Sequence, residues 1–306
     1  MTPPNAPLPD WRLRTVRRII RLLPRGRNIA IHRWVRHIVT WSEVTCKTSY
    51  GFKMAVNLQE QLARDIFFNG VYEPVTAAVI NHLLQPGDVF FDIGANQGFF
   101  SLLGAKRVGT QGAVYSFEPN TSVRRLLEQS TAVNGFTNVH PQEHACMEKA
   151  GIFALLLGGE AENAHGSAKT LDCTREQGEL TVSGVSLDGF VAENDIRRID
   201  LVKMDIEGGE ARALAGMQEI LKQRLVKNLI VEFHPELGLP GGRAGMIRLA
   251  AEIEAAGYTR KQLHEFPPGL FSHYRCRFSN ELLYAPRENG SMREVATPQY
   301  LFQRIA

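Results

Sequence analysis

The stretch "DVFFDIGANQGFF", residues 88–100, determines the fold class of this 306-residue chain. Residues 89–91 form an apolar run typical of a buried strand, and Asp92 follows directly. Gly94 and Gly98 enclose a short turn, after which the apolar residues from Phe99 onward have helical spacing. A strand, a tight turn and a helix in this order predict the opening of a nucleotide-binding βαβ unit.

Strands and helices alternate through most of the chain. A second strand is expected at 112–119, ending in Glu118, and a short third strand near 138–146 contains Pro141, which favours an edge position. Further strands are expected at 151–159, 179–187, 199–208, 227–235, 258–264 and 280–285, with a loop over 158–179. Helices are expected at 72–88, 121–133, 209–223 and 243–257. This alternation predicts an α/β fold with a doubly wound, mostly parallel sheet.

The composition excludes several classes of protein. Hydrophobic residues make up 44% and charged residues 22%, as in a globular protein with a full core. The four cysteines (Cys46, Cys146, Cys173 and Cys276) are far apart, which argues against a zinc ribbon, a dithiol site or a disulfide scaffold. No run of about 18 apolar residues and no secretory signal is present, so we expect a cytosolic location.

The N-terminal segment is strongly basic. Residues 11–42 contain nine arginines and no acidic residue. On a helix, Arg14, Arg17, Arg18 and Arg21 share one face, while an apolar arc from Trp11 to Leu23 occupies the other. Three interpretations remain open: packing of the apolar arc on the main domain, contact of residues 11–37 with an anionic membrane at its inner face, or contact with nucleic acid. No RRM-type or zinc-finger signature supports the last.

The turn after the first strand favours one nucleotide over another. A dinucleotide-binding site requires the motif G-x-G-x-x-G, but here Asn96 occupies the position of the second glycine. The pattern from Asp92 to Gly98 suits S-adenosylmethionine, which has no pyrophosphate. The glycines would let backbone amides approach the methionine and ribose, and Asp92 would accept from the ammonium. Glu118, 20 residues after Gly98, would accept from both ribose hydroxyls. Alternatively, Asp92 caps the helix and Glu118 is a solvated strand end.

Several segments together resemble one family. They are "NGVYEP", "DIGANQGFFSLL", "VYSFEPN", "VSLDGF", "IDLVKMDIEGGEARALAG" and "IVEFHPE". In these the chain is similar to the FkbM-type S-adenosylmethionine-dependent methyltransferases over roughly residues 65–285, most specifically in "KMDIEGGE". The resemblance implies the class I methyltransferase fold, Rossmann-like, with seven strands and one antiparallel strand at the edge. It also implies methylation of a hydroxyl on a sugar, glycan, polyketide or related small molecule.

The resemblance also suggests domain limits and cofactor contacts. We expect a basic, partly helical extension over 1–45, a methyltransferase domain over 46–287 and a tail over 288–306. The expected contacts to S-adenosylmethionine are Glu73, Asp92, Gly94, Ala95, Asn96, Gly98, Glu118, Pro119, Asn120 and Asp205. Tyr72 and Glu73 would cover the cofactor. His165 and Ser167 would face the acceptor, or else lie in a surface loop.

Transfer of a methyl group to a hydroxyl needs a general base or a metal ion. His234 is the first candidate base because an ordinary imidazole pKa near 6.5 suits proton abstraction, and Glu207 or Asp205 is the second. For Glu207 and Glu210, compensation of a helix dipole is the alternative role. Asp205, Glu232 and His234 could instead hold a divalent cation, although a metal is not favoured.

Two other functions remain as alternatives. A nicotinamide-dependent oxidoreductase would need a glycine spacing that this turn lacks. A non-catalytic methyltransferase-like binding protein would have no reason to keep Asp92, Glu118 and Asp205. The sequence predicts neither the acceptor nor the oligomeric state, and the preference for oxygen over nitrogen rests on the resemblance.

Overall fold

The computed structural model describes residues 11–22, 43–156, 170–171, 179–235, 239–263 and 299–304. Its centre is a seven-stranded sheet of order β12-β13-β11-β10-β3-β4-β5. The strands are β3 (Val89–Ile93), β4 (Ala113–Phe117), β5 (Val139–Gln142), β10 (Leu201–Met204), β11 (Asn228–Glu232), β12 (Tyr258–Leu263) and β13 (Gln299–Arg304). From β5 to β11 neighbouring strands are parallel. The predicted α/β fold with a mostly parallel seven-stranded sheet is confirmed, and β5, which contains Pro141, is an edge strand.

The C-terminal end of the sheet differs from the prediction. β13 is antiparallel to both β11 and β12, so the antiparallel strand lies one place inside the edge and not at it. β13 lies beyond the expected domain limit at residue 287, and its Gln299 pairs with Glu232 inside the sheet. The strand expected at 280–285 lies outside the described residues.

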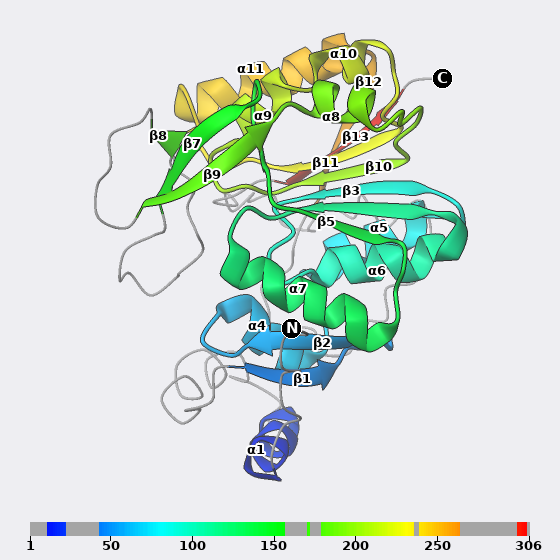
Figure 1. Cartoon of the computed structure of the whole chain (residues 1–306), viewed down its shortest axis with the longest axis vertical. Helices are drawn as coiled ribbons and strands as arrows, with labels where there is room; N and C mark the ends of the chain where they lie inside the picture. The colour runs from blue at the N-terminus through cyan, green and yellow to red at the C-terminus, as the bar shows by residue number, and fades with distance from the viewer. Residues whose placement is uncertain are drawn as a thin grey trace, which may run out of the picture.

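Helices cover both faces of the sheet (Figure 1). One face carries α5 (Pro74–Leu83), α6 (Phe99–Val108), which runs into the short η2 (Gly109–Gln111), and α7 (Thr121–Asn134). The other carries α8 (Leu187–Glu193), α9 (Glu210–Ala215), α10 (Gln218–Lys222) and α11 (Gly242–Ala255). Alternate side chains of a strand point to opposite faces. Phe90 therefore joins one core and Phe91 the other, and Asp92 lies on the α6 side with Phe90.

A second sheet follows the edge strand β5. It contains β6 (Ala145–Cys146), β7 (Gly151–Leu156), β8 (Thr170–Leu171) and β9 (Glu179–Val185) in the order β6-β9-β7-β8. The strands predicted at 151–159 and 179–187 are confirmed as the antiparallel pair β7 and β9. Thr170–Leu171 pairs with β7, although a loop was expected there. His165 and Ser167 lie outside the described residues.

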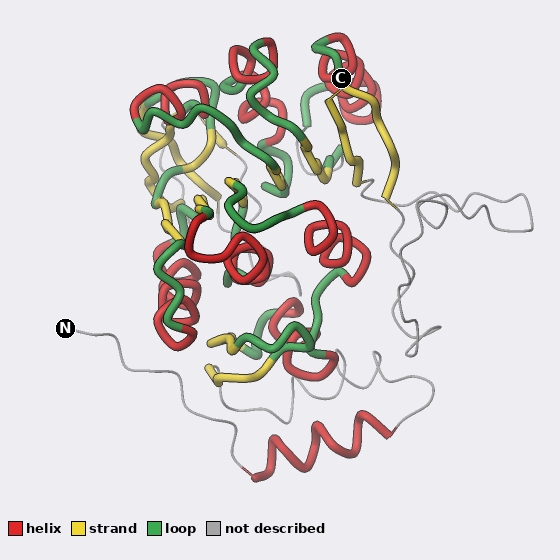
Figure 2. The backbone as a smooth tube through the Cα atoms, turned by 90° about the vertical axis from the view of Figure 1, so that its right-hand side faces the viewer, coloured by secondary structure: helices red, strands yellow, loops and turns green. Residues whose placement is uncertain are grey.

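The N-terminal elements lie at the end of the molecule remote from α11 (Figures 1 and 2). They are α1 (Trp11–Leu22), the hairpin of β1 (Glu43–Lys47) and β2 (Lys53–Asn57), and α4 (Gln61–Asn69). The hairpin is tied to α7, since Ser130 accepts a hydrogen bond from the Ala55 N–H. Within the described part of the chain, no helix combines the length and the apolar character needed to cross a membrane.

Candidate active site

A cavity of about 290 Å³ lies where β3, β4 and β10 end. This is the edge at which an open α/β sheet binds its ligands. Its walls come from the turn after β3, the end of β4, the loop after β10 and the second sheet. Of the predicted site residues, Gly94, Ala95, Asn96, Glu118, Pro119, Asn120, Asp205 and Glu207 line it. Asp92, Gly98, Glu73, Glu232 and His234 do not belong to the lining.

The turn after β3 is closed by its own hydrogen bonds. The N–H groups of Gly94 and Ala95 both donate to the Phe117 carbonyl, and that of Gly98 donates to Ala95. The N–H of Gln97 donates to the side chain of Asn96. The N–H groups of Gly94, Ala95 and Gly98 therefore already have acceptors within the protein.

Gly94 and Gly98 allow the turn to pack closely against its neighbours. A Cβ on Gly94, whose φ is 78°, would lie 1.8 Å from the Asp205 carbonyl oxygen. A Cβ on Gly98, whose φ is 90°, would lie 2.3 Å from Leu127. Both positions combine a left-handed backbone with a close neighbour, and only glycine tolerates that combination. Gly94 thus lets the turn after β3 touch the loop after β10.

Asp92 lies beneath the cavity. Its side chain is fully buried, and its Oδ2 accepts a hydrogen bond of 2.5 Å from the Ser101 hydroxyl at the start of α6. Burial raises the pKa of Asp92, while Lys203 and Ser101 lower it. The predicted contact between Asp92 and a cofactor ammonium therefore has no counterpart in the cavity lining, and its visible role is to hold β3 and α6 together.

Glu118 is held in place at the end of β4. Its two carboxylate oxygens accept the N–H groups of Asn96 and Asn120, each at 2.9 Å. Burial raises the pKa of Glu118 to about 7, while those two N–H groups and Arg124 lower it. Asn120 also caps α7 by accepting from the Ser122 N–H. The carboxylate thus faces the cavity with a fixed orientation, as a group that binds a diol requires.

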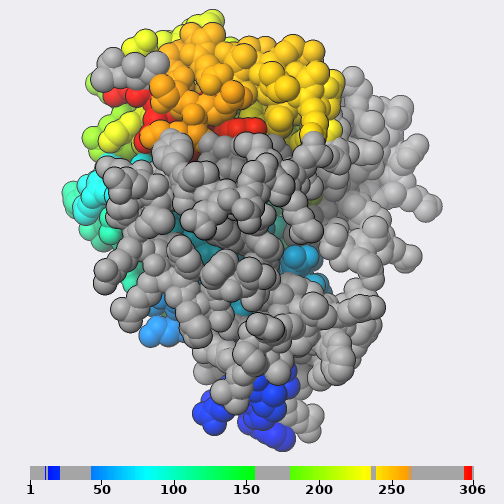
Figure 3. Space-filling view, turned by 180° about the vertical axis from the view of Figure 1, so that it is seen from behind, coloured from blue at the N-terminus to red at the C-terminus, as the bar shows by residue number. Residues whose placement is uncertain are grey.

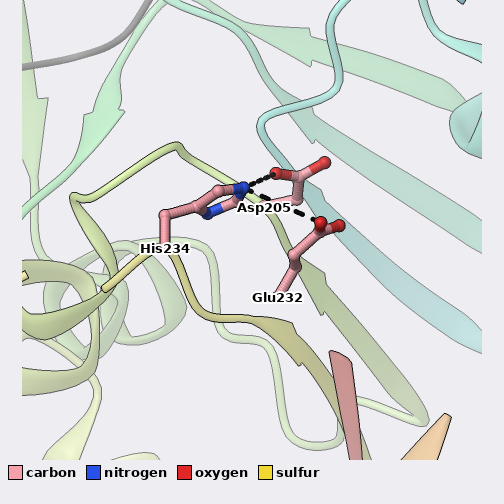
Figure 4. Close-up of side chains that lie close together, drawn as sticks. All are labelled: Asp205, Glu232 and His234. Atoms are coloured by element: carbon pink, nitrogen blue, oxygen red, sulfur yellow. Dashed lines mark ion pairs between the residues drawn. The ribbon is translucent and has the colours of Figure 1, made fainter. Parts of the chain in front are cut away.

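Behind the other end of the cavity lies a charged cluster, formed by Lys203, Asp205, Glu210, Glu232 and His234. His234 Nε2 lies 3.7 Å from Asp205 Oδ1 and 3.7 Å from Glu232 Oε1 (Figure 4). On the other side of the ring, His234 Nδ1 lies 2.9 Å from Glu210 Oε1, an oxygen that also accepts from the Gly208 N–H. Of these acids, only Asp205 reaches the cavity wall.

The surroundings of His234 change its protonation. Burial alone lowers its pKa, but the hydrogen bond with Glu210 and the charges of Asp205, Glu210 and Glu232 raise it to about 9. The ring is therefore protonated near neutral pH and has no lone pair for an incoming proton. The prediction of His234 as the base assumed an ordinary imidazole, whereas the raised pKa favours the protonated ring.

Glu232, within the cluster, and Tyr72, beside it, both have raised pKa values. Burial, and then Asp205 and Glu73, raise the pKa of Glu232 to about 8. Burial, and then Glu73, Asp205 and Glu232, raise the pKa of Tyr72 well above its usual value, so this cavity-lining phenol stays a hydrogen-bond donor. Glu73 begins α5 with a left-handed φ of 37°, and Glu207 has a φ of 48°. Such strain in non-glycine residues often accompanies functional sites.

Lys203 is a site residue that the sequence analysis missed. Its ammonium lies 3.0 Å from Asp205 Oδ2 and 5.0 Å from the centre of the Phe100 ring, and it lines the cavity. Burial alone lowers the pKa of Lys203, but Asp205, Asp92 and Glu73 raise it above its ordinary value. The sequence could have indicated Lys203, because it precedes Asp205 by two residues in the predicted strand, and residues i and i+2 of a strand share a face.

The second sheet supplies a wall that no motif indicated. Cys146, Met147, Phe153, Leu155 and Val182 give the cavity an apolar side. His144 also lines it, with Nδ1 2.8 Å from the Ser183 hydroxyl. Cys146 is a free, buried thiol whose pKa is raised by burial, so it contributes to packing.

Comparison with known proteins supplies the family. The model of the methyltransferase FkbM domain matches residues 92–259, which include the whole turn and the charged cluster. The chain belongs to the FkbM methyltransferase family. It therefore belongs among the S-adenosylmethionine-dependent methyltransferases, as the resemblance predicted, and the oxidoreductase alternative is excluded.

Two curated relatives place this FkbM-family chain among characterised enzymes. It is 30% identical over 195 residues to the 31-O-demethyl-FK506 methyltransferase FkbM of Streptomyces tacrolimicus, covering 54% of this chain and 72% of the relative. It is 29% identical over 160 residues to the hexuronic acid methyltransferase AglP of Haloferax volcanii, covering 51% of this chain and 61% of the relative. Among solved structures, an S-adenosylmethionine-dependent O-methyltransferase from Thermotoga maritima aligns with a TM-score of 0.42 and 13% identity, covering 86% of this chain and 77% of that one.

Proposed function

We propose that this FkbM-family enzyme transfers the methyl group of S-adenosylmethionine to a hydroxyl of a small molecule or glycan. One observation carries the proposal: a single cavity joins the fixed carboxylate of Glu118 to the carboxylate of Asp205. The first is suited to the cofactor's ribose, and the second to the acceptor. The preference for a hydroxyl draws on the two relatives, of which one is named for O-methylation and the other for a hexuronic acid.

On this proposal the ribose hydroxyls donate to Glu118, whose oxygens are already aimed by Asn96 and Asn120. The sulfonium then lies toward Asp205. During transfer the acceptor oxygen forms a bond to the methyl carbon, the carbon–sulfur bond breaks, and the sulfonium becomes a neutral thioether. The enzyme's main contribution is alignment of the three atoms.

The hydroxyl proton goes to Asp205, the cluster acid that faces the cavity. Lys203 and the protonated His234 keep this carboxylate ionised and oriented between transfers. Glu207 also lines the cavity and is assigned to acceptor contact. His234 thus changes from predicted base to positioning residue, and Glu210 holds it through Nδ1.

A divalent cation is the alternative use of the cluster. Oxygen and nitrogen atoms of Asp205, Glu232 and His234 all lie within 4.8 Å of one another, and the Glu210 contact leaves His234 Nε2 facing the two acids. Lys203, however, already supplies a positive charge to Asp205 at 3.0 Å. We therefore expect dialysis against EDTA to leave turnover unchanged, and restoration of lost activity by Mg²⁺ or Mn²⁺ alone would reverse this assignment.

Mass spectrometry with isotope-labelled S-adenosylmethionine tests the proposed reaction. Hydroxylated acceptors, including neutral sugars, uronic acids and polyketide alcohols, are incubated with the enzyme and with the Glu118→Gln variant. We expect a labelled methyl ether in one class with the wild type and none with the variant. Label on nitrogen or carbon, or equal label with both proteins, would contradict the proposal.

A further inference from the structure

Part of the apolar arc of α1 packs inward. Leu13 and Ile20 are 2% and 6% exposed and belong to the core that lies on the α6 side of the sheet. Val16 packs against that same core, and the guanidinium of Arg17 lies 5.0 Å from the centre of the Phe67 ring in α4. Leu13, Val16 and Ile20 thus pack as the packing interpretation expected, whereas Trp11 and Ile19 of the same arc are exposed. The buried side chains of α1 cannot also enter a membrane without leaving the domain.

The opposite face of α1 remains at the surface, and it is not simply polar. It presents Trp11, 68% exposed, and Ile19, 57% exposed, with the exposed Arg14 and Arg18 between them. We call these four residues the α1 outer face. At 3.6 residues per turn they share one side of the helix. In the space-filling view from behind, α1 forms the end of the molecule opposite α11 (Figure 3).

The sequence segment that contains α1 is opposite in charge to the rest of the chain. The whole chain has a formal charge of +3, and residues 11–42 contribute nine arginines without one acid. The remainder is therefore net negative. A molecule with this asymmetry approaches an anionic surface with the basic end first. Of these arginines, Arg14 and Arg18 lie on the α1 outer face beside the exposed Trp11 and Ile19, whereas Arg17 packs against Phe67.

We propose that the α1 outer face docks on an anionic lipid surface. Arg14 and Arg18 meet the charged headgroups, and Trp11 and Ile19 enter the headgroup region, where tryptophan is preferred because it is both apolar and a hydrogen-bond donor. A nucleic acid would use the arginines but would leave the isoleucine exposed. The docking does not depend on the methyl transfer proposed above.

The site is connected to this surface through α4. Phe67 of α4 holds Arg17, and Leu62, near the start of the same helix, lines the cavity. Docking through α1 would therefore fix the position of the cavity relative to the membrane. This would favour acceptors that are themselves held at a membrane.

Cosedimentation of the full chain with vesicles tests the docking. We use phosphatidylcholine alone and phosphatidylcholine mixed with phosphatidylglycerol, at low and high salt. The variants are Arg14→Glu/Arg18→Glu, Trp11→Ser/Ile19→Ser, and a matched control, Arg197→Glu/Lys222→Glu. The control makes the same charge change at exposed residues, with Lys222 in α10 at the far end of the molecule. Far-UV circular dichroism and melting confirm that each variant is folded.

We expect the wild type and the control to bind only the anionic vesicles, and more weakly at high salt. Reversing Arg14 and Arg18 weakens binding at least about tenfold, since each cation near such a surface contributes about fivefold. The Trp11→Ser/Ile19→Ser variant binds more weakly at both salt concentrations. Three results would each overturn the proposal. They are equal binding of the wild type to both vesicle types, and binding of the arginine variant equal to that of the wild type. The third is a wild type that binds no vesicle but shifts RNA in a gel, with the arginine variant losing that shift.

Discussion

The two ends of the cavity are built by different means. Around the turn after β3, backbone N–H groups and two glycines fix the geometry, and Glu118 is aimed by two main-chain donors. The charged cluster is instead held by side-chain charges from β10, α9 and the end of β11. On the proposed function, the first arrangement holds the cofactor in one fixed orientation. The second gives a set of coupled charges that can accept and release a proton.

Asp205→Asn separates the two ends most sharply. The amide keeps the size of the side chain but cannot accept a proton, so we expect kcat to fall about 10²- to 10⁴-fold. The dissociation constant of S-adenosylhomocysteine, measured by calorimetry, should change by less than about threefold, below 1 kcal/mol. Glu219→Gln, an exposed acid in α10, is the control and should leave both unchanged. Lost affinity with normal kcat would place Asp205 in the cofactor site.

Gly94→Ala disrupts the contact between the turn after β3 and the loop after β10, which joins the two ends of the cavity. The new Cβ would meet the Asp205 carbonyl oxygen at 1.8 Å in a backbone with positive φ. We expect the free energy of unfolding to fall by about 3–5 kcal/mol, in the range of severe core defects. Gly87→Ala is the matched control, because Gly87 also has a positive φ, 86°, but has nothing within 4 Å. It should lose only about 1 kcal/mol. Similar losses in both variants, measured by denaturant unfolding, would show that backbone strain alone matters.

The pH dependence of cofactor affinity sharpens the description of Glu118. Its pKa of about 7 means that the unliganded carboxylate ionises across neutral pH. Because the ribose hydroxyls bind the ionised form, affinity for S-adenosylhomocysteine should rise roughly tenfold from about pH 6 to about pH 8. Glu118→Gln should bind more weakly and show no such rise. A falling or flat profile in the wild type would exclude this role.

The Glu210→Gln variant tests how Glu210 changes the pKa of His234, which is the smallest of the expected effects. Loss of the Glu210 charge should lower the pKa of His234 from about 9 toward or below its ordinary value. The titration of the ring is measured by nuclear magnetic resonance. In the wild type the raised pKa stabilises the fold fully below about pH 6.5, and that contribution is lost as pH rises through about 9. The variant should show a smaller loss of stability over this window. An unchanged titration would remove Glu210 as its cause.

The difference between the ends also explains what the sequence could predict. β3, the turn and α6 were predicted because one contiguous stretch encodes them, and Glu118 lies at the end of the next strand. The cluster depends on partners far apart in the sequence, such as Glu210 and His234, whose contact follows from the packing of α9 against the end of β11. No local pattern shows that this contact raises the pKa of His234. The prediction of His234 as the base was made without that information.

The position of β13 was missed for a related reason. Its pairing joins residues 299–304 to β11 and β12, whereas the last strand was expected at 280–285. For Asp92, the motif gives the position of the residue but not the direction of its side chain. The period of the strand turns it toward Ser101 and α6, away from the cavity lining.

A crystal structure with S-adenosylhomocysteine tests the central claim most directly. The account predicts density for the ribose against the Glu118 carboxylate, with the sulfur toward Asp205 and the end of β10. Density with the ribose at the charged cluster, or a ligand bound outside this cavity, would contradict it.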